Sequence, residues 1–144
     1  MLNMKVTPQE AGQIRVGGHI VIKNRACKVN SISTSKTGKH GHAKCHFVAT
    51  DIFTKKKYEM IETSTHNVSV PVIEKTEYTL LDISEEQYLT LMDASGEVRV
   101  DLKMPNNETL SNSIIKLYEN GDGVVIIVMN ALNEEIVYNI RRES

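Results

Sequence analysis

Short runs of apolar residues alternate with polar residues along most of the chain, and turn-forming residues separate these runs. In the first half, residues 20–22, 26–29 and 46–49 follow this pattern, and residues 52–61 continue it around a lysine-rich turn. A period of two is typical of β-strands with one buried and one solvated face. Many short strands joined by turns predict a small barrel or sandwich over residues 4–72.

The second half shows the same alternation and adds one helical segment. Apolar residues at helical spacing predict a helix over 110–118, which Thr109 or Ser111 caps and Gly121 ends. Three strands, a helix and two strands follow one another in an OB-fold, a five-stranded barrel that binds nucleic acid or packs on protein. The strands are expected at residues 77–83, 87–92, 97–104, 124–129 and 135–140.

Charge divides the chain near Val70-Pro71-Val72, where the proline predicts a short, stiff linker. Residues 1–72 carry 11 Lys and Arg against 4 Asp and Glu, whereas residues 73–144 carry 6 against 14. We therefore expect a basic domain over 1–72 and an acidic domain over 73–144. A basic domain favours a polyanionic partner, and two ordinary domains with unequal surfaces explain the charge equally well.

Composition narrows the class of protein. No apolar run approaches the roughly 20 residues that span a bilayer, and the first residues lack the apolar centre of a signal peptide. We expect a cytoplasmic protein without a membrane partner. Cys27 and Cys45 lack CxxC spacing, which favours reduced, half-buried cysteines over a disulfide or redox pair.

The segment from Ser33 to Lys44 places Lys39 between glycines, and it predicts a tight loop at the tip of a long hairpin. From Ala11 through Thr50 the sequence has no acidic residue. An acid-free cationic tip suits phosphates, sugar edges and RNA grooves, and equally an enzyme that draws a lysine into a deep active site. An exposed turn lysine without a function is the plain alternative.

Two other chemistries fit this segment less well. A phosphate-binding loop needs glycine in place of Ser33 and Ser or Thr in place of His40, followed by a helix. Zinc ligands usually come from separated segments, whereas His40, His42, Cys45 and His46 share one strand on which Cys45 faces away from His42 and His46. We predict no metal, no cofactor and no catalytic residues, and therefore a binding module and not an enzyme.

The run from Ser33 to Lys44, followed by Asp51-Ile52-Phe53-Thr54 and Ser64-Thr65-His66-Asn67-Val68, resembles the eukaryotic translation initiation factor 5A family. Its members contain hypusine and are related to bacterial elongation factor P. The likeness covers nearly the whole chain and is densest at the lysine segment. It implies a mainly β fold of two small barrels, an SH3-like barrel over 1–72 with the hypusine loop at 33–44 and an OB-fold with one short helix over 73–144.

The resemblance implies that Lys39 is converted to hypusine, with no bound cofactor. In the family an aminobutyl group from spermidine is added to the lysine and then hydroxylated, so deoxyhypusine synthase and deoxyhypusine hydroxylase are implied partners. The surrounding residues would contact these enzymes, the ribosome and tRNA. They are Lys36, Thr37, Gly38, His40, Gly41, His42 and Lys44.

Members of this family bind the ribosome beside the peptidyl-tRNA, in or near the exit site, where rRNA surrounds them. The implied function is to stabilise peptidyl-tRNA, to promote peptide-bond formation at stalled sites such as polyproline, and to support termination. Two alternatives stay open, namely an OB-fold RNA-binding or chaperone-like protein that acts without lysine modification, and a structural scaffold. The sequence also leaves a homodimer open.

The chain departs from the family pattern at two places. Lys55 stands where relatives usually have a turn glycine. The segment before the first barrel is short and lacks the acidic extension of many relatives, so contacts of such an extension are not expected.

Overall fold

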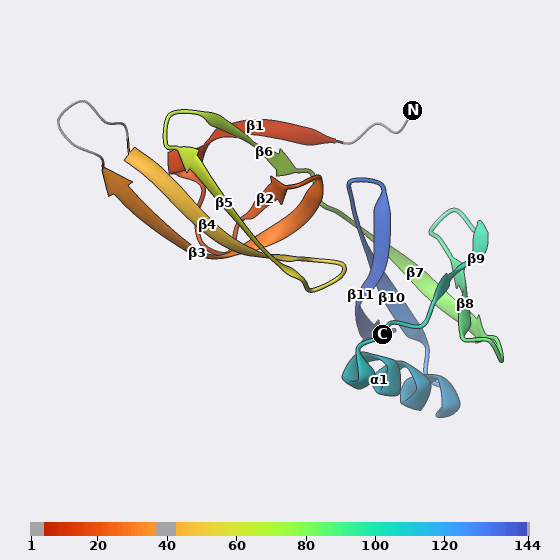
Figure 1. Cartoon of the computed structure of the whole chain (residues 1–144). Helices are drawn as coiled ribbons and strands as arrows, with labels where there is room; N and C mark the ends of the chain where they lie inside the picture. The colour runs from red at the N-terminus through yellow and green to blue at the C-terminus, as the bar shows by residue number, and fades with distance from the viewer. Residues whose placement is uncertain (1–4, 37–42, 144) are drawn as a thin grey trace. The chain divides into compact units, whose positions relative to one another are not determined.

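The computed structural model describes residues 5–36 and 43–143, which form eleven strands, one 3₁₀ turn and one α-helix (Figure 1). The mainly β fold with one short helix is therefore confirmed. The chain forms two compact units: Met1–Ile73 together with Ala131–Glu134, and Glu74–Asn130 together with Glu135–Ser144. No helix among the described residues is long and apolar enough to cross a membrane.

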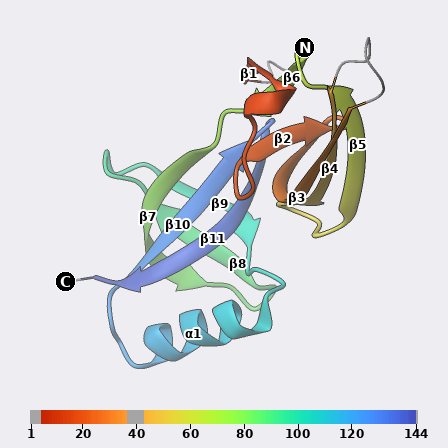
Figure 2. The same cartoon turned by 90° about the vertical axis from the view of Figure 1, so that its left-hand side faces the viewer.

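The first unit contains a strongly curled sheet (Figure 2) in the antiparallel order β2-β3-β4-β5. This is the SH3-like barrel that the family resemblance implies. Its strands are β2 (His19–Ile22), β3 (Arg25–Lys36), β4 (Ala43–Asp51) and β5 (Lys57–Thr63). A second sheet pairs β1 (Val6–Glu10) with β6 (Asn67–Pro71), and the 3₁₀ turn Ala11–Gln13 follows β1. The linker expected at 70–72 is wrong in part, because Pro71 ends β6 opposite Val6, a position where proline is tolerated.

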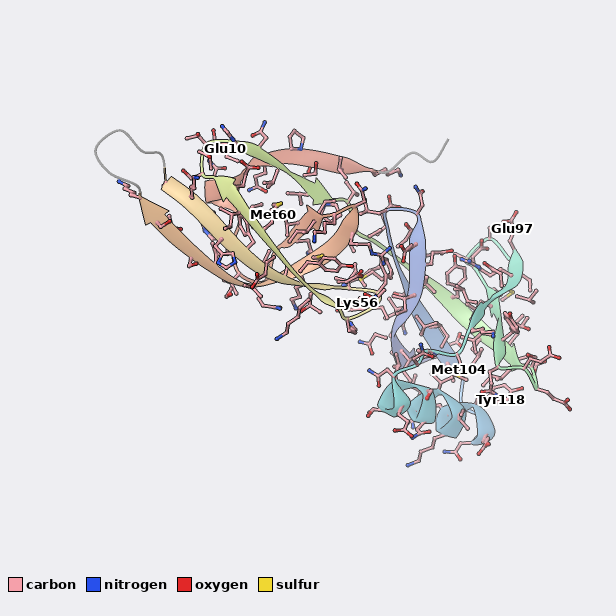
Figure 3. The ribbon with its side chains drawn as sticks, in the orientation of Figure 1. Glu10, Lys56, Met60, Glu97, Met104 and Tyr118 are labelled. Atoms are coloured by element: carbon pink, nitrogen blue, oxygen red, sulfur yellow. The ribbon has the colours of Figure 1, made fainter. Side chains whose placement is uncertain are left out.

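Alternation along β4 builds the core of the first unit. Cys45, Phe47 and Ala49 are buried, whereas Lys44, which precedes Cys45 on the strand, is exposed. The core also takes Ile20, Ile22, Cys27 and Val29, and half-buried Met60 packs against it (Figure 3). Both cysteines are free thiols, as the sequence predicts, and they are more fully buried than expected. Burial raises the pKa of the Cys27 thiol to about 11.

Asp51 is the fully buried charged residue at the end of β4. Its carboxylate accepts hydrogen bonds from Arg25 Nε at 2.6 Å and from the backbone N–H groups of Phe53 at 2.8 Å and Thr54 at 3.2 Å. Burial alone would raise its pKa, but these donors outweigh burial and lower the pKa to about 2. The charged form of Asp51 therefore holds the β4–β5 turn in place.

We expect the variant Asp51→Asn to be less stable by an amount that depends on pH. Because the folded-state pKa of Asp51 is depressed, its charge stabilises the fold above the ordinary carboxyl pKa, and this stabilisation is lost as pH falls through about 2. The difference in unfolding free energy between the two proteins should shrink by about 2 kcal/mol between pH 5 and pH 2. Urea unfolding at a series of pH values, followed by NMR signals of β3 and β4, measures this difference. A difference that stays constant with pH would refute the stabilising role of the Asp51 charge.

Lys55 lies in the β4–β5 turn with a φ of 68°, in the left-handed region that favours glycine. Its backbone N–H donates to Asp51 O at 2.9 Å, which closes the turn. The exposed Lys55 Nζ adds only a 3.3 Å hydrogen bond to Ile52 O. The departure from a turn glycine thus leaves the turn formed, with a non-glycine residue in a strained conformation.

Lys55→Gly is expected to raise the unfolding free energy by about 0.5–1 kcal/mol, because removal of the left-handed strain exceeds the added chain entropy. Lys56→Gly is the matched control, since this exposed neighbour is outside the left-handed region and should lose stability. Chemical denaturation of both variants measures the two changes. An equal decrease in unfolding free energy for both variants would show that the backbone of Lys55 is unstrained.

The second unit is a five-stranded antiparallel sheet in the order β11-β10-β7-β8-β9, with α1 at one end of it (Figure 2). This is the predicted OB-fold order of three strands, a helix and two strands. Ile114 of α1 is buried in the core with Leu89, Leu91 and Ile126. The elements are β7 (Glu74–Ile83), β8 (Tyr88–Met92), β9 (Val98–Lys103), α1 (Glu108–Glu119), β10 (Val124–Ala131) and β11 (Glu134–Arg142).

The helix begins at Glu108, two residues earlier than its apolar spacing indicates. Asn107 is the N-cap, and its side chain accepts a hydrogen bond from Leu110 N at 3.1 Å, so the expected caps Thr109 and Ser111 are wrong. Asparagine is as favourable an N-cap as serine. The apolar spacing does not indicate Asn107, because this residue precedes the first apolar position of the repeat. Gly121, at a φ of 78°, ends the helix as predicted.

Candidate functional site

The candidate site is the outer end of β3 and β4, two neighbouring strands of the four-stranded sheet that we call the β3–β4 ribbon. The strands pair in an antiparallel register from Cys27 opposite Asp51 to Lys36 opposite Ala43, with a shift between Val29 and Ser31. Residues 37–42 connect the two strands in the sequence. This connection contains most of the predicted site residues, which lie outside the described part of the chain, namely Thr37, Gly38, Lys39, His40, Gly41 and His42.

The end of β3 extends beyond the core of its own unit. The buried residues of β3 end at Val29, Ile32 is half-buried, and four successive residues, Ser33 to Lys36, are all exposed. In a strand over a core, every second residue would be covered. The last four residues of β3 are therefore exposed on both faces of this strand, although Thr34 pairs with the buried Cys45 of β4.

Lys36 and Lys44, the two predicted site residues that are described, are both exposed and flank the connection. Lys44 pairs with Ser35, one position before Lys36, so the two lysines point to opposite faces of the ribbon. Within residues 5–36 and 43–143, neither lysine forms an ion pair. The base of the connection is thus cationic on both faces.

The stretch without acids in the sequence meets acids across the sheet. Glu59 of β5 lies next to β4, and its Oε1 is 3.9 Å from His46 Nε2. Glu62, also on β5, accepts a 2.9 Å hydrogen bond from His66, whose ring holds the pKa of Glu62 below its ordinary value. The acid-free character therefore belongs to β3 and to β4 as far as Thr50, and it ends at β5.

Backbone hydrogen bonds support the start of β4. Ser64 N donates to Ala43 O at 2.8 Å, and Gly12 N donates to Ser64 O at 2.9 Å. A Cβ atom on Gly12 would lie 3.2 Å from Ser64 O, so this close approach favours glycine. The 3₁₀ turn and the turn after β5 thereby fix the strand that leaves the candidate site.

The described residues contain no group of three or more His, Cys, Asp or Glu side chains that could hold a metal ion. Cys45 and His46 point to opposite faces of β4, since Cys45 is buried and His46 is half-exposed. The other two residues of the zinc alternative, His40 and His42, belong to the connection that is not described.

The fold and the site define a class of protein: a mainly β protein in which an SH3-like barrel presents one cationic ribbon and an OB-fold follows. Two family models match the chain. "Translation initiation factor 5A-like, N-terminal" matches residues 4–66, and "Eukaryotic elongation factor 5A hypusine, DNA-binding OB fold" matches residues 72–141.

Individual relatives agree with these matches. Eukaryotic translation initiation factor 5A-1 from Arabidopsis thaliana is 55% identical over 131 residues, 91% of this chain and 83% of the relative. The factor 5A-1 from Solanum lycopersicum is 52% identical and covers 95% of this chain and 86% of the relative. A factor 5A family structure from Naegleria fowleri superposes with a TM-score of 0.83 at 40% identity, over 94% of this chain and 98% of that one. The chain belongs to the eukaryotic translation initiation factor 5A family and is a translation factor of that family.

Sequence reasoning missed the groups that support the site. Gly12 gives no signal, because one glycine near a predicted turn is ordinary. Asp51 could have been found, since it is an acid at an alternating position of β4 that should be buried, and a buried carboxylate needs donors. Arg25, 26 residues away, could not have been assigned as its partner without the register.

Proposed function

We propose that this factor binds the ribosome beside the peptidyl-tRNA, in the exit-site region, and directs a hypusine side chain at Lys39 toward the peptidyl-transferase centre. There it stabilises the peptidyl-tRNA, promotes peptide-bond formation at stalls such as consecutive prolines, and supports termination. It acts in the cytoplasm and does not itself catalyse a reaction by acid–base or nucleophilic chemistry. Deoxyhypusine synthase and deoxyhypusine hydroxylase are its modifying enzymes.

The observation that carries this proposal is the exposed end of the β3–β4 ribbon. Four successive exposed residues end β3, and the register sets Lys36 opposite Ala43. A chain segment joined to such a ribbon can enter a narrow crevice while the barrel stays outside. Exposed lysines on both ribbon faces favour the approach to RNA phosphates.

The added arm explains why one modified lysine matters. An aminobutyl group lengthens the reach of Lys39 by roughly 5 Å if each added bond advances as in an extended chain. It also brings a second cationic nitrogen and a hydroxyl that donates to RNA. Holding the acceptor end of a tRNA in reactive geometry accelerates the reaction by orientation.

The main alternative is an RNA-binding protein that needs no modification. The name of the second family model includes a DNA-binding OB fold, and OB-folds bind single-stranded nucleic acid through their sheet. This alternative spreads affinity over both units and makes activity independent of Lys39. The variant described next separates the two.

Lys39→Arg is expected to keep the fold and the positive charge and to abolish both modification and translation support. Intact mass spectrometry should find the variant without the added aminobutyl and hydroxyl groups. In cells depleted of their own factor, output from a consecutive-proline reporter should fall at least about tenfold, because the orienting arm is lost.

The matched control is Lys28→Arg, which changes an exposed lysine of the same ribbon outside the predicted contact residues and should preserve both readouts. Undiminished reporter output from Lys39→Arg would reject the modification-dependent mechanism in favour of the RNA-binding alternative. An equal loss from both variants would show that the charge geometry of the whole ribbon matters and that Lys39 has no special role.

A further inference from the structure

The edge strand β9 of the second unit presents its valines to solvent and its arginine to the interior. Val98 and Val100 are 54% and 60% exposed, whereas the side chain of Arg99 between them is only 23% exposed. Burial of the valines is the usual arrangement for an alternating strand. The inverted arrangement leaves two branched apolar side chains uncovered.

Arg99 is held inside by polar partners from three strands. Its guanidinium donates to Glu135 of β11 at 2.7 and 2.9 Å and to Tyr78 OH of β7 at 3.1 Å. It also donates to Asp101 of its own strand at 2.6 and 2.7 Å. The carboxylates of Glu135 and Asp101 thus balance the positive charge of Arg99. A register shift between β8 and β9, at Leu89 and Leu91, allows the arginine to face inward and the valines outward.

Further apolar side chains lie beside these valines on the outer face of the sheet. Met92 of β8 is the registered partner of Val98. On β7, a register shift between Leu80 and Asp82 turns Leu81 outward, where it is 45% exposed. Three neighbouring strands therefore share one apolar patch, which we define as Leu81, Tyr88, Met92, Val98 and Val100. Contiguous exposed apolar surface marks sites of interaction.

Acids surround the apolar patch. Glu97, labelled in Figure 3, and Asp93 lie in the β8–β9 turn, and Glu85 and Glu86 lie in the β7–β8 turn. Asp82 lies on the face itself and accepts a 2.7 Å hydrogen bond from Tyr118 OH. Lys103 is a cation beside the apolar patch, and its Nζ lies 5.1 Å from the centre of the Tyr88 ring. The rim is therefore predominantly negative.

We propose that the apolar patch is a docking surface for a basic segment of another protein, in which lysines or arginines flank aliphatic side chains. The aliphatic side chains would cover Leu81, Val98 and Val100, and the cations would meet the acidic rim. The same acidic rim repels phosphates. Nucleic acid, which many OB-folds bind on this sheet face, is therefore not expected to bind there in this protein. This surface belongs to the second unit and adds a partner that the proposed function of Lys39 does not require.

The test uses the isotope-labelled full chain and NMR titration with a short synthetic peptide that alternates lysine with valine. We expect amide shifts confined to β7, β8, β9 and their turns. The double variant Val98→Thr/Val100→Thr keeps the branched shape and strand propensity, and it should weaken binding at least about tenfold by loss of apolar contact. The matched control is Ile61→Thr, which changes a residue that is 63% exposed in the first unit and should leave the affinity unchanged.

A second variant tests the charge argument without touching the valines. Glu85→Lys/Glu86→Lys, in an exposed turn, should also weaken binding of the lysine peptide severalfold. The proposal is overturned if the lysine peptide causes no shifts at this face, or if both double variants bind it unchanged. It is also overturned if oligouridylate, or the same peptide with glutamate in place of lysine, shifts the same amides as strongly.

Discussion

The antiparallel pairing of β3 with β4 is the constraint on which the candidate site depends. Phe47 and its neighbours at alternate positions are buried in the core, so a slip by one residue would bring Lys44 inside and expose Phe47. Burial of one such aromatic stabilises the fold by about 1.5–3 kcal/mol, which fixes the register. The fixed register sets Lys36 opposite Ala43, so the ends of the lysine segment are placed by packing that lies well inside the barrel.

The two units have different surfaces, and the difference follows from which residues each sheet leaves uncovered. The first unit exposes lysines and hydroxyl groups along a ribbon, whereas the second exposes valines within an acidic rim. Phosphates are attracted to the first surface and repelled by the second. This difference agrees with our two proposals, in which the first unit contacts RNA and the second unit contacts a basic protein segment.

Most strands, the helix and the mainly β class could be predicted from periodicity and turn residues, whereas the SH3-like barrel was implied by the family resemblance. The helix start was missed because Asn107 is set by backbone donors and not by the apolar repeat. The inversion of β9 could not be predicted, since Arg99 is turned inward by Glu135, a partner 36 residues away. The site was located by its glycines and by family resemblance. Of its residues, Lys36 and Lys44 are exposed as expected, and the assignment of hypusine to Lys39 stays a prediction.

The most direct test of the account is the rate of peptide-bond formation on purified ribosomes stalled at consecutive prolines. Two preparations of the same chain would be compared, one with Lys39 converted to hypusine and one with Lys39 left as lysine, after both are shown to have the same fold. The account predicts that only the modified preparation accelerates bond formation, because the barrels alone cannot orient the tRNA end. Equal acceleration by both preparations would contradict it.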